Sequence, residues 1–352
     1  MVEWLAGNRL RGTTAERPNL GLPSGSVGGW VEVGRTTLGS AGDDIDITSL
    51  PDKRYYHVLV SQLPTGSAVG KLTLNNDSGS NYARRFSVNG ASDTAQSSIA
   101  EIGLTTTETN PNFQSIYLAN LSSKEKLGFI HNVRQNTVGA GNAPNRAEQV
   151  FKWANTSNAI SRVDVYNSST GSFDTGSEVV VLGYDPDDTH TTNFWEELDS
   201  VTLGSAGDTL QSNTFTAKKY LWIQYFLQGS ATDLETQITF NADSGSNYTQ
   251  RRSQNGGSDV TNINQSRLEP IVNKNNYNYF GNMFFINNAS NEKLGIHHSV
   301  EQTGTGAGNA PSRHEGVMKW INTSDQITSI KIFNNGAADY EAGTTIKVWG
   351  SD

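Results

Sequence analysis

The sequence predicts a mainly β protein made of two tandem homologous jelly-roll-like β-sandwich domains with an extended N-terminal arm. Three observations lead to this prediction. The 352 residues include 35 Gly and many Asn, Ser and Thr, a composition typical of turns and of strands with polar outer faces. No window shows a long apolar stripe at helical spacing, because Gly or Asn interrupts nearly every one. The chain also repeats itself along its length.

The internal repeat divides the chain into domains. The recurring segments are LGSAGD at Leu38–Asp43 and Leu203–Asp208, DSGSNY at Asp77–Tyr82 and Asp243–Tyr248, EKLG at Glu125–Gly128 and Glu292–Gly295, GAGNAP at Gly139–Pro144 and Gly306–Pro311, KW-x-NTS at Lys152–Ser157 and Lys319–Ser324, and a closing Gly-x-Asp at Gly183–Asp185 and Gly350–Asp352. Their offset grows by one residue twice, which indicates single-residue insertions in loops. We therefore expect an arm over residues 1–29, a β-sandwich over 30–185, a linker over 186–194 and a second β-sandwich over 195–352.

Each domain is expected to hold about eight to ten short strands, as in a sandwich or jelly roll. In the first domain they are Asp44–Ile47, Tyr55–Leu63, Lys71–Asn75, Phe113–Asn120, Leu127–Gln135, Ala147–Trp153, Ile160–Tyr166 and Ser177–Leu182. In the second they are Tyr220–Leu227, Gln237–Phe240, Phe280–Asn287, Leu294–Gln302, His314–Trp320, Ile327–Phe333 and Thr344–Trp349. A parallel α/β fold would need crossover helices, and the sequence offers no pattern for them.

Composition and charge exclude several classes of function. The net charge is −9, so we expect no general affinity for nucleic acid. There are no cysteines, which rules out disulfides, thiol catalysis and thiolate metal sites. No run of 18 apolar residues predicts a membrane span, and the first residues do not have the pattern of a secretory signal.

Two loops of the repeat are weak candidates for calcium. Asp77 and Asp243 each lie in an Asn-, Ser- and Gly-rich loop whose oxygens would suit Ca²⁺. Each loop brings one carboxylate, whereas Ca²⁺ takes about six to eight oxygen ligands. A tight turn, with Gly supplying a positive φ, is the favoured interpretation.

Several charged residues recur in both copies. Arg85 aligns with Arg251, and we expect each to form an ion pair within its own domain, with the recurring Asp93 and Asp259. Around the GAGNAP loop a His, an Arg and a Glu also recur, as His131 and His298, Arg146 and Arg313, and Glu148 and Glu315. They would suit a general-base site, but no nucleophile or metal motif accompanies them, so we expect structural Arg–Glu pairs and half-buried histidines.

Tryptophans recur as well. Trp153 aligns with Trp320, and Trp30 with Trp195. Exposed rings of this kind stack on sugars, but in β-sandwiches a recurring Trp is typical of the core or the domain edge. The core or the domain edge is therefore the favoured position for these tryptophans.

The end of each repeat carries a family resemblance. KW-x-NTS-x-x-I-(T/S)-x-(I/V), a loop, and G-(S/T)-x-(V/I)-x-(V/L)-x-G span Lys152–Gly183 and Lys319–Gly350. This pattern resembles the β-sandwich modules of virion structural proteins from phages and other tailed viruses. The resemblance implies a place in a virus particle, as capsid, decoration or tail protein, with no catalytic residues and no cofactor.

The arm fits an assembly role. It combines apolar and cationic side chains that have no core of their own, namely Trp4, Leu5, Arg9, Arg11 and Arg17. We expect it to contact further copies of the chain, as a homo-oligomer, or other virion proteins.

Three functions remain open at this stage. The leading hypothesis is a virion structural protein, a capsid shell or decoration (cement) protein, made in the host cytoplasm. A tail, fibre or adhesin-type carbohydrate-binding module that recognises a host surface glycan is the alternative. A virion-associated glycan-degrading enzyme ranks third, because it needs a pair of carboxylates with shifted pKa values and none stands out in the sequence.

Overall fold

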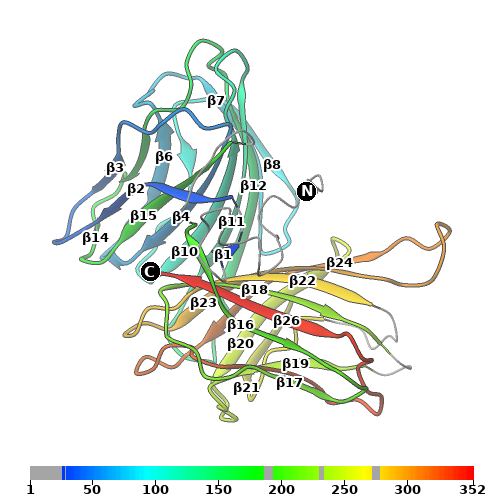
Figure 1. Ribbon diagram of the computed structural model, residues 1–352. Coiled ribbons are helices and arrows are strands. Elements are labelled where there is room, and N and C mark those ends of the chain that lie inside the picture. Colours follow the sequence, from blue (N-terminus) through cyan, green and yellow to red (C-terminus); the bar gives the residue numbers. More distant parts are fainter. Residues whose placement is uncertain (1–25, 28, 186–192, 230–233, 272–277) are drawn as a thin grey trace.

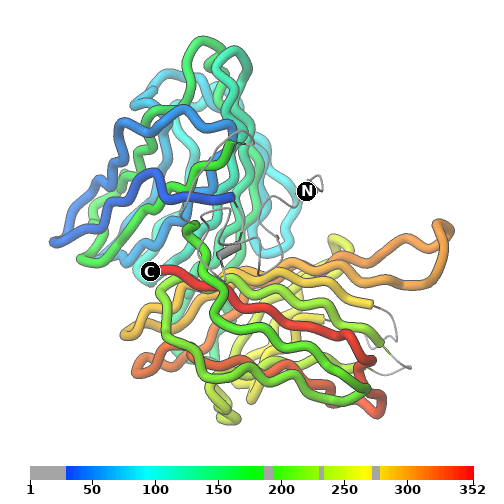
Figure 2. The backbone as a smooth tube through the Cα atoms, viewed as in Figure 1, coloured from blue at the N-terminus to red at the C-terminus, as the bar shows by residue number. Residues whose placement is uncertain are grey.

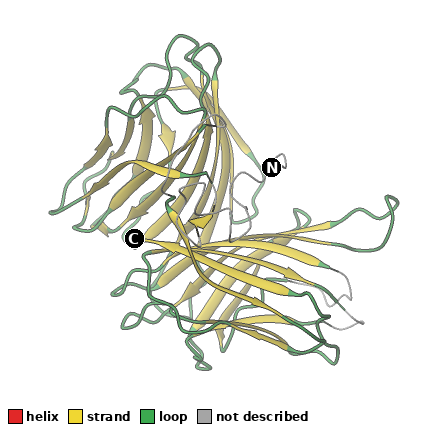
Figure 3. Cartoon of the chain, in the orientation of Figure 1, coloured by secondary structure: helices red, strands yellow, loops and turns green. Residues whose placement is uncertain are grey.

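The computed structural model describes residues 26–27, 29–185, 193–229, 234–271 and 278–352. The described part of the chain consists of strands and connecting loops, arranged as two halves (Figure 3). The predictions for residues 1–25 and for linker residues 186–192 concern segments outside the described part of the chain. Among the described residues no helix is long and apolar enough to cross a membrane.

The first half, domain 1, is a sandwich of one large and one small antiparallel sheet (Figure 1). The large sheet holds, in spatial order, β2 (Val31–Thr37), β15 (Glu178–Tyr184), β4 (Tyr55–Gln62), β10 (Asn112–Ala119), β11 (Lys126–Arg134), β12 (Asn145–Trp153), β7 (Tyr82–Val88) and β8 (Thr94–Ile99). The small sheet holds β3 (Asp44–Ile47), β13 (Val163–Asn167), β6 (Gly70–Leu74) and β9 (Ile102–Gly103), and β14 (Ser172–Phe173) pairs with β5 (Pro64–Thr65).

The second half, domain 2, repeats this arrangement. Its large sheet holds β16 (Trp195–Thr202), β26 (Thr345–Ser351), β18 (Tyr220–Leu227), β22 (Tyr279–Ile286), β23 (Lys293–Glu301), β24 (Ser312–Trp320), β20 (Tyr248–Gln254) and β21 (Val260–Gln265), and its small sheet holds β17 (Thr209–Gln211), β25 (Ile330–Asn334) and β19 (Thr236–Phe240). The predicted fold class is therefore confirmed: the protein is all-β, with two tandem sandwiches.

One strand lies outside the predicted plan. β1 (Ser26–Val27) pairs with β16 and so extends the large sheet of domain 2 rather than that of domain 1. The end of the predicted arm is thus bound to the domain that is more distant along the chain.

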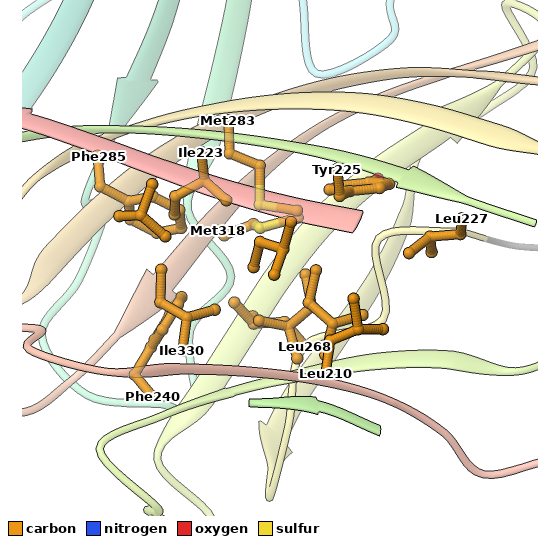
Figure 4. Packing of buried hydrophobic residues seen from close by; sticks show 14 of the residues in the cluster. Leu210, Ile223, Tyr225, Leu227, Phe240, Leu268, Met283, Phe285, Met318 and Ile330 are labelled. Carbon is orange, nitrogen blue, oxygen red and sulfur yellow. The ribbon is translucent and has the colours of Figure 1, made fainter. Parts of the chain in front are cut away.

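Each sandwich has its own core between its two sheets. In domain 2 the core includes Ile223, Phe240, Phe285 and Met318, which interdigitate in Figure 4. Alternate residues of each strand point into this core, and the residues between them point to the outer face of the large sheet. The outer face is therefore where the sequence is free to serve another purpose.

A third apolar cluster joins the two domains. It is formed by the outer faces of both large sheets, and includes Leu59, Phe113 and Val133 of domain 1 with Phe284 and Trp349 of domain 2. The two sandwiches are thus held together sheet against sheet, and Figure 1 shows them meeting near the middle of the molecule.

The repeated motifs have structural explanations. Lys126 of the first EKLG segment is buried and its Nζ donates to the backbone oxygens of Ser122, Lys124 and Asn155, at 3.2, 3.0 and 2.9 Å. Lys293 makes the same three bonds in the second copy, at 3.2, 2.9 and 2.8 Å. The Lys of EKLG therefore recurs as a buried anchor for backbone oxygens, whereas the Asn of KW-x-NTS recurs because its Oδ1 accepts from the backbone N–H groups two and three residues further on.

Candidate functional site

The outer face of the large sheet in domain 1 carries an open groove of about 890 Å³. It runs across β4, β10, β11, β12, β7 and β8, and its floor and rim include Trp30, Tyr55, Tyr117, Leu127, Phe129 and Val150. Strand alternation places residues such as Tyr117, Leu127 and Val150 on this face, because they lie between the core residues of their strands. The groove is thus a sheet face that domain 2 leaves partly uncovered.

The apolar residues of the groove are unusually exposed. The exposed fractions of Leu127, Phe129 and Val150 are 58%, 42% and 54%, and that of Tyr55 is 39%. A contiguous apolar patch with a polar rim is typical of a surface that binds another molecule. Arg85 and Lys152 supply part of that rim.

Aromatic rings order one end of the groove. Tyr117 stacks on His57, with ring centroids 4.0 Å apart, and Trp30 meets Tyr117 edge-on at 6.1 Å. The His57 ring is buried and its Nε2 lies 2.9 Å from Ser115 Oγ. Burial lowers the pKa of His57 to about 3, so this ring is neutral and acts as a packed support for Tyr117.

The recurring His, Arg and Glu residues meet between the domains. His131 and His298 occupy equivalent positions in the two copies, and their ring centroids lie 4.0 Å apart. Arg146 Nη1 lies 2.5 Å from Glu148 Oε1 and 3.2 Å from Glu315 Oε2. The two copies of one strand pair therefore face each other across the domain contact.

The electrostatics of this cluster are dominated by burial and by the two neighbouring carboxyls. Burial and the nearby Glu315 outweigh the attraction of Arg146 and raise the pKa of Glu148 to about 7. Burial lowers the pKa of His298 to about 3, with smaller contributions from His297, Arg146 and Arg313. Neither carboxyl lines the groove.

The predicted Arg–Glu pairs are present, but one ion pair differs from expectation. Arg146 pairs with Glu148, and Arg313 Nε lies 3.0 Å from Glu315 Oε1. Asp259, expected to pair within its own domain, is bound most closely across the domains, by Arg146 Nη2 at 2.8 Å.

The intradomain ion pairs predicted for the aligned arginines are only partly present. Arg251 Nη1 is 3.7 Å from Asp259 Oδ2. In domain 1 the corresponding Arg85 and Asp93 are both exposed. The sequence could not reveal this difference, because the repeat does not indicate which copy of a surface is covered.

The calcium candidates are turns, but the positive φ predicted for Gly is adopted instead by Asn75 and Asn76, and by Asn241 and Ala242 in the second copy. Asp77 Oδ1 accepts from the backbone N–H of Gly79 at 2.9 Å, and Asp77 Oδ2 accepts from Asn81 Nδ2 at 2.9 Å and from Trp153 Nε1 at 2.7 Å. Burial opposes ionisation, but the hydrogen bonds, led by that of Trp153, outweigh it and lower the pKa of Asp77. The carboxylate is thus occupied by protein donors.

The second copy of this turn is built identically. Asp243 accepts from Trp320 Nε1 at 2.7 Å and from the N–H of Gly245 at 2.8 Å. Over the described residues, no three His, Asp or Glu side chains gather in a way that could hold a metal ion.

The recurring tryptophans Trp153 and Trp320 are fully buried and belong to the two domain cores, the first of the two predicted positions. They cannot offer a ring to a sugar at the surface, which removes the support that the sequence gave to a glycan site at these positions. The five residues assigned to assembly in the arm, Trp4, Leu5, Arg9, Arg11 and Arg17, lie outside the described residues.

Comparison with known proteins gives distant structural likenesses. No protein family model matches the chain, and no curated protein does. Domains LG4-5 of the mouse laminin α1 chain are similar with a TM-score of 0.20 and 11% identity, over 93% of this chain and 91% of that chain. Neisserial surface protein A has a TM-score of 0.11 and 6% identity over 79% of this chain and 96% of that chain. An outer membrane channel from Pseudomonas putida F1 has a TM-score of 0.14 and 11% identity over 81% of this chain and 97% of that chain.

Proposed function

We propose that this chain is a structural subunit of a larger assembly, and that it docks through the groove on domain 1. The observation that carries the proposal is the exposure of Leu127, Phe129 and Val150 on the outer face of the large sheet. Covering three such side chains contributes roughly 1–3 kcal/mol each in apolar burial. The largest apolar patch on the surface of a soluble protein is often a functional one.

The assembly we propose is a virus particle, with the chain as a shell or decoration protein. Support for this part comes from the resemblance of Lys152–Gly183 and Lys319–Gly350 to virion β-sandwich modules. The role requires no cofactor and no catalysis. Glu148 and Glu315 form the carboxyl pair that a glycan-degrading enzyme would need, but Arg146 bridges them and both lie between the domains rather than in the groove.

A glycan is the second candidate for the groove, because aromatic rings line it. Tyr55 and Tyr184 stack at its rim, with centroids 6.2 Å apart. Rings of this kind bind the apolar faces of sugars. A glycan array probed with the parent chain and with Tyr55→Ala separates the two functions: a hit that is lost in the variant favours the glycan.

Electron cryomicroscopy of the full chain at high concentration tests the structural role. Ordered shells, sheets or fibres in which the outer face of domain 1 is covered support the proposal. Single molecules with an open groove at every concentration would overturn it. Val150→Glu serves as the control and is expected not to assemble. Val150 is 54% exposed in the groove, so the substitution places a charge on the proposed contact surface without disturbing the core.

A further inference from the structure

Both copies of the repeat contain the residues that form the contact between the domains. In the structure, one domain contributes the loop and the other contributes the sheet face, so half of these residues make no such contact. We name its parts as follows. Donor loop 1 is residues 135–144 and donor loop 2 is residues 302–311, at equivalent places between β11 and β12 and between β23 and β24. Receptor face 1 is Arg85, Glu125, Leu127, Phe129, Val150 and Lys152, and receptor face 2 is Arg251, Glu292, Leu294, Ile296, Val317 and Lys319.

Donor loop 1 is seated on receptor face 2. Gln135 Nε2 donates to Glu292 Oε2 at 2.7 Å, and the N–H of Gly139 donates to Glu292 Oε1 at 2.6 Å. Lys319 Nζ donates to the backbone oxygen of Thr137 at 2.7 Å and is itself 3.2 Å from Glu292 Oε2. The buried carboxylate and the buried ammonium are thus both satisfied by the loop.

Two arginines complete this seat. Arg251 Nε donates to the backbone oxygen of Pro144 at 2.9 Å. Arg146, which follows the loop, binds Asp259 through Nη2 at 2.8 Å. Charged groups at both ends of the loop therefore fix its position on domain 2.

The apolar part of the contact shows the same asymmetry. Leu294, Ile296 and Val317 of receptor face 2 are 1%, 3% and 2% exposed. Their counterparts on receptor face 1, described above as the groove, are the most exposed large apolar side chains of that sheet. One face is covered, and its copy is open.

The donor side shows the reverse pattern. Phe113 and Val133 of domain 1, beside donor loop 1, are 1% and 0% exposed. Their counterparts in domain 2, Phe280 and Val300, are 46% and 42% exposed. The donor surface of domain 2 and receptor face 1 of domain 1 are therefore both exposed, because the equivalent contact forms only between donor loop 1 and receptor face 2.

The unused half keeps the chemistry of the used half. Loop 2 retains the residue types of loop 1 at the contact positions, namely Gln302 for Gln135, Ala307 for Ala140, Pro311 for Pro144 and Arg313 for Arg146. Receptor face 1 retains Glu125, Lys152 and Arg85, with Asp93 in place of Asp259. Lys152 and Glu125 pair with each other at the surface, 2.9 Å apart, as Lys319 and Glu292 do beneath loop 1.

We propose that donor loop 2 of one copy of this chain binds receptor face 1 of a second copy. This inference rests on the proposed function and names the partner of the groove. Residues Thr305–Pro311 of the loop are exposed, and the loop projects away from domain 1 at the far end of domain 2 (Figure 2). Because every copy carries one open loop and one open face, the contact links copies head to tail.

Cross-linking tests the pairing directly, since the chain has no native cysteine. Full chains carrying Glu125→Cys alone and Gln302→Cys alone are mixed and treated with a short bismaleimide. The prediction is a covalent dimer that contains one chain of each kind, formed roughly tenfold more than when Ser40→Cys replaces Glu125→Cys. Ser40 is exposed and follows β2, an edge strand that β15, β4 and β10 separate from β11.

Charge reversal gives a second test. Arg313→Asp is expected to weaken self-association about tenfold or more, and adding Asp93→Arg to the same chain is expected to restore it. A third sample is a chain that carries both Glu125→Cys and Gln302→Cys. A cross-link that forms within this single chain, with none between the two single-cysteine chains, would overturn the second copy as the occupant. Assembly without the cross-link would overturn this pairing and leave the proposed function standing, whereas the absence of any assembly would overturn both.

Discussion

Equivalent leucines in the two domains provide a sensitive test of how the domains pack. Leu294 is 1% exposed beneath donor loop 1, whereas Leu127, at the same position of the repeat, is 58% exposed. Changing either residue to Ala removes three carbon atoms, worth about 2.4 kcal/mol of transfer free energy if they are buried. A residual cavity raises the cost, so Leu294→Ala is expected to lower the free energy of unfolding by about 2–5 kcal/mol. Leu127→Ala is expected to change it by about 0.5 kcal/mol or less.

The assay is urea denaturation of dilute full-length chain, followed by tryptophan fluorescence. A second pair controls for a general difference in stability between the domains, because its burial is reversed. Val133 is 0% exposed in domain 1 and its counterpart Val300 is 42% exposed in domain 2. Val133→Ala should therefore destabilise more than Val300→Ala. Equal losses from Leu127→Ala and Leu294→Ala in the dilute chain would refute the asymmetric packing.

Three other predictions concern charged groups. Lys319→Met is expected to lower the free energy of unfolding by about 3 kcal/mol or more, because it leaves the buried carboxylate of Glu292 without its cation. Lys152→Met, which breaks the exposed pair with Glu125, should lower it by about 0.5 kcal/mol or less. Asp77→Ala is expected to cost about 1–3 kcal/mol through the lost turn and the orphaned indole N–H, and neither calcium nor a chelator should shift the melting temperature of the parent chain. Burial holds the pKa of both His57 and His297 at about 3 in the folded chain, whereas a histidine of the unfolded chain has a pKa of about 6.5. Between these two pH values the unfolded chain binds a proton at each histidine and the folded chain does not. Stability is therefore present above pH 6.5 and falls as the pH is lowered, by roughly 2 kcal/mol per histidine between pH 7 and 5.

Each of these has a contradicting result. Equal costs at the two lysines would mean that donor loop 1 does not cover its face. A calcium-dependent rise in melting temperature would return Asp77 to the metal candidates. For the histidines, the double variant His57→Gln with His297→Gln should lose less stability than the parent between pH 7 and 5, and an equal loss would show that other groups are responsible.

The sequence predicted strands in which apolar residues predominate and missed most of those in which polar residues do. The missed strands include β7 and β20, which are rich in Arg, Gln and Ser although each places a buried tyrosine in the core. The strand Tyr220–Leu227 was predicted with the boundaries that the structure gives β18, because half of its residues belong to the core. β8 and β21 were missed because they are edge strands with polar, largely exposed side chains. β2 and β16 were missed for a similar reason, since much of their surface remains in contact with solvent.

The candidate site was only partly predictable. The repeat identified the recurring residues, including His131, His298 and Arg146, and indicated that they are structural. It did not indicate that the two histidines meet, because a repeat specifies what each copy contains and not how the copies pack. The exposure of Leu127 beside the burial of Leu294 depends on tertiary packing alone, and the two residues are the same in sequence terms.

Sedimentation velocity of the full chain over a range of concentrations tests most directly whether the open face of domain 1 exists to be covered. The parent chain is expected to form larger species as its concentration rises, while Val150→Glu stays monomeric at the same concentrations and keeps the parent's urea midpoint in dilute solution. A parent chain that remains a monomer throughout, or a Val150→Glu chain that associates as strongly as the parent, would contradict the account.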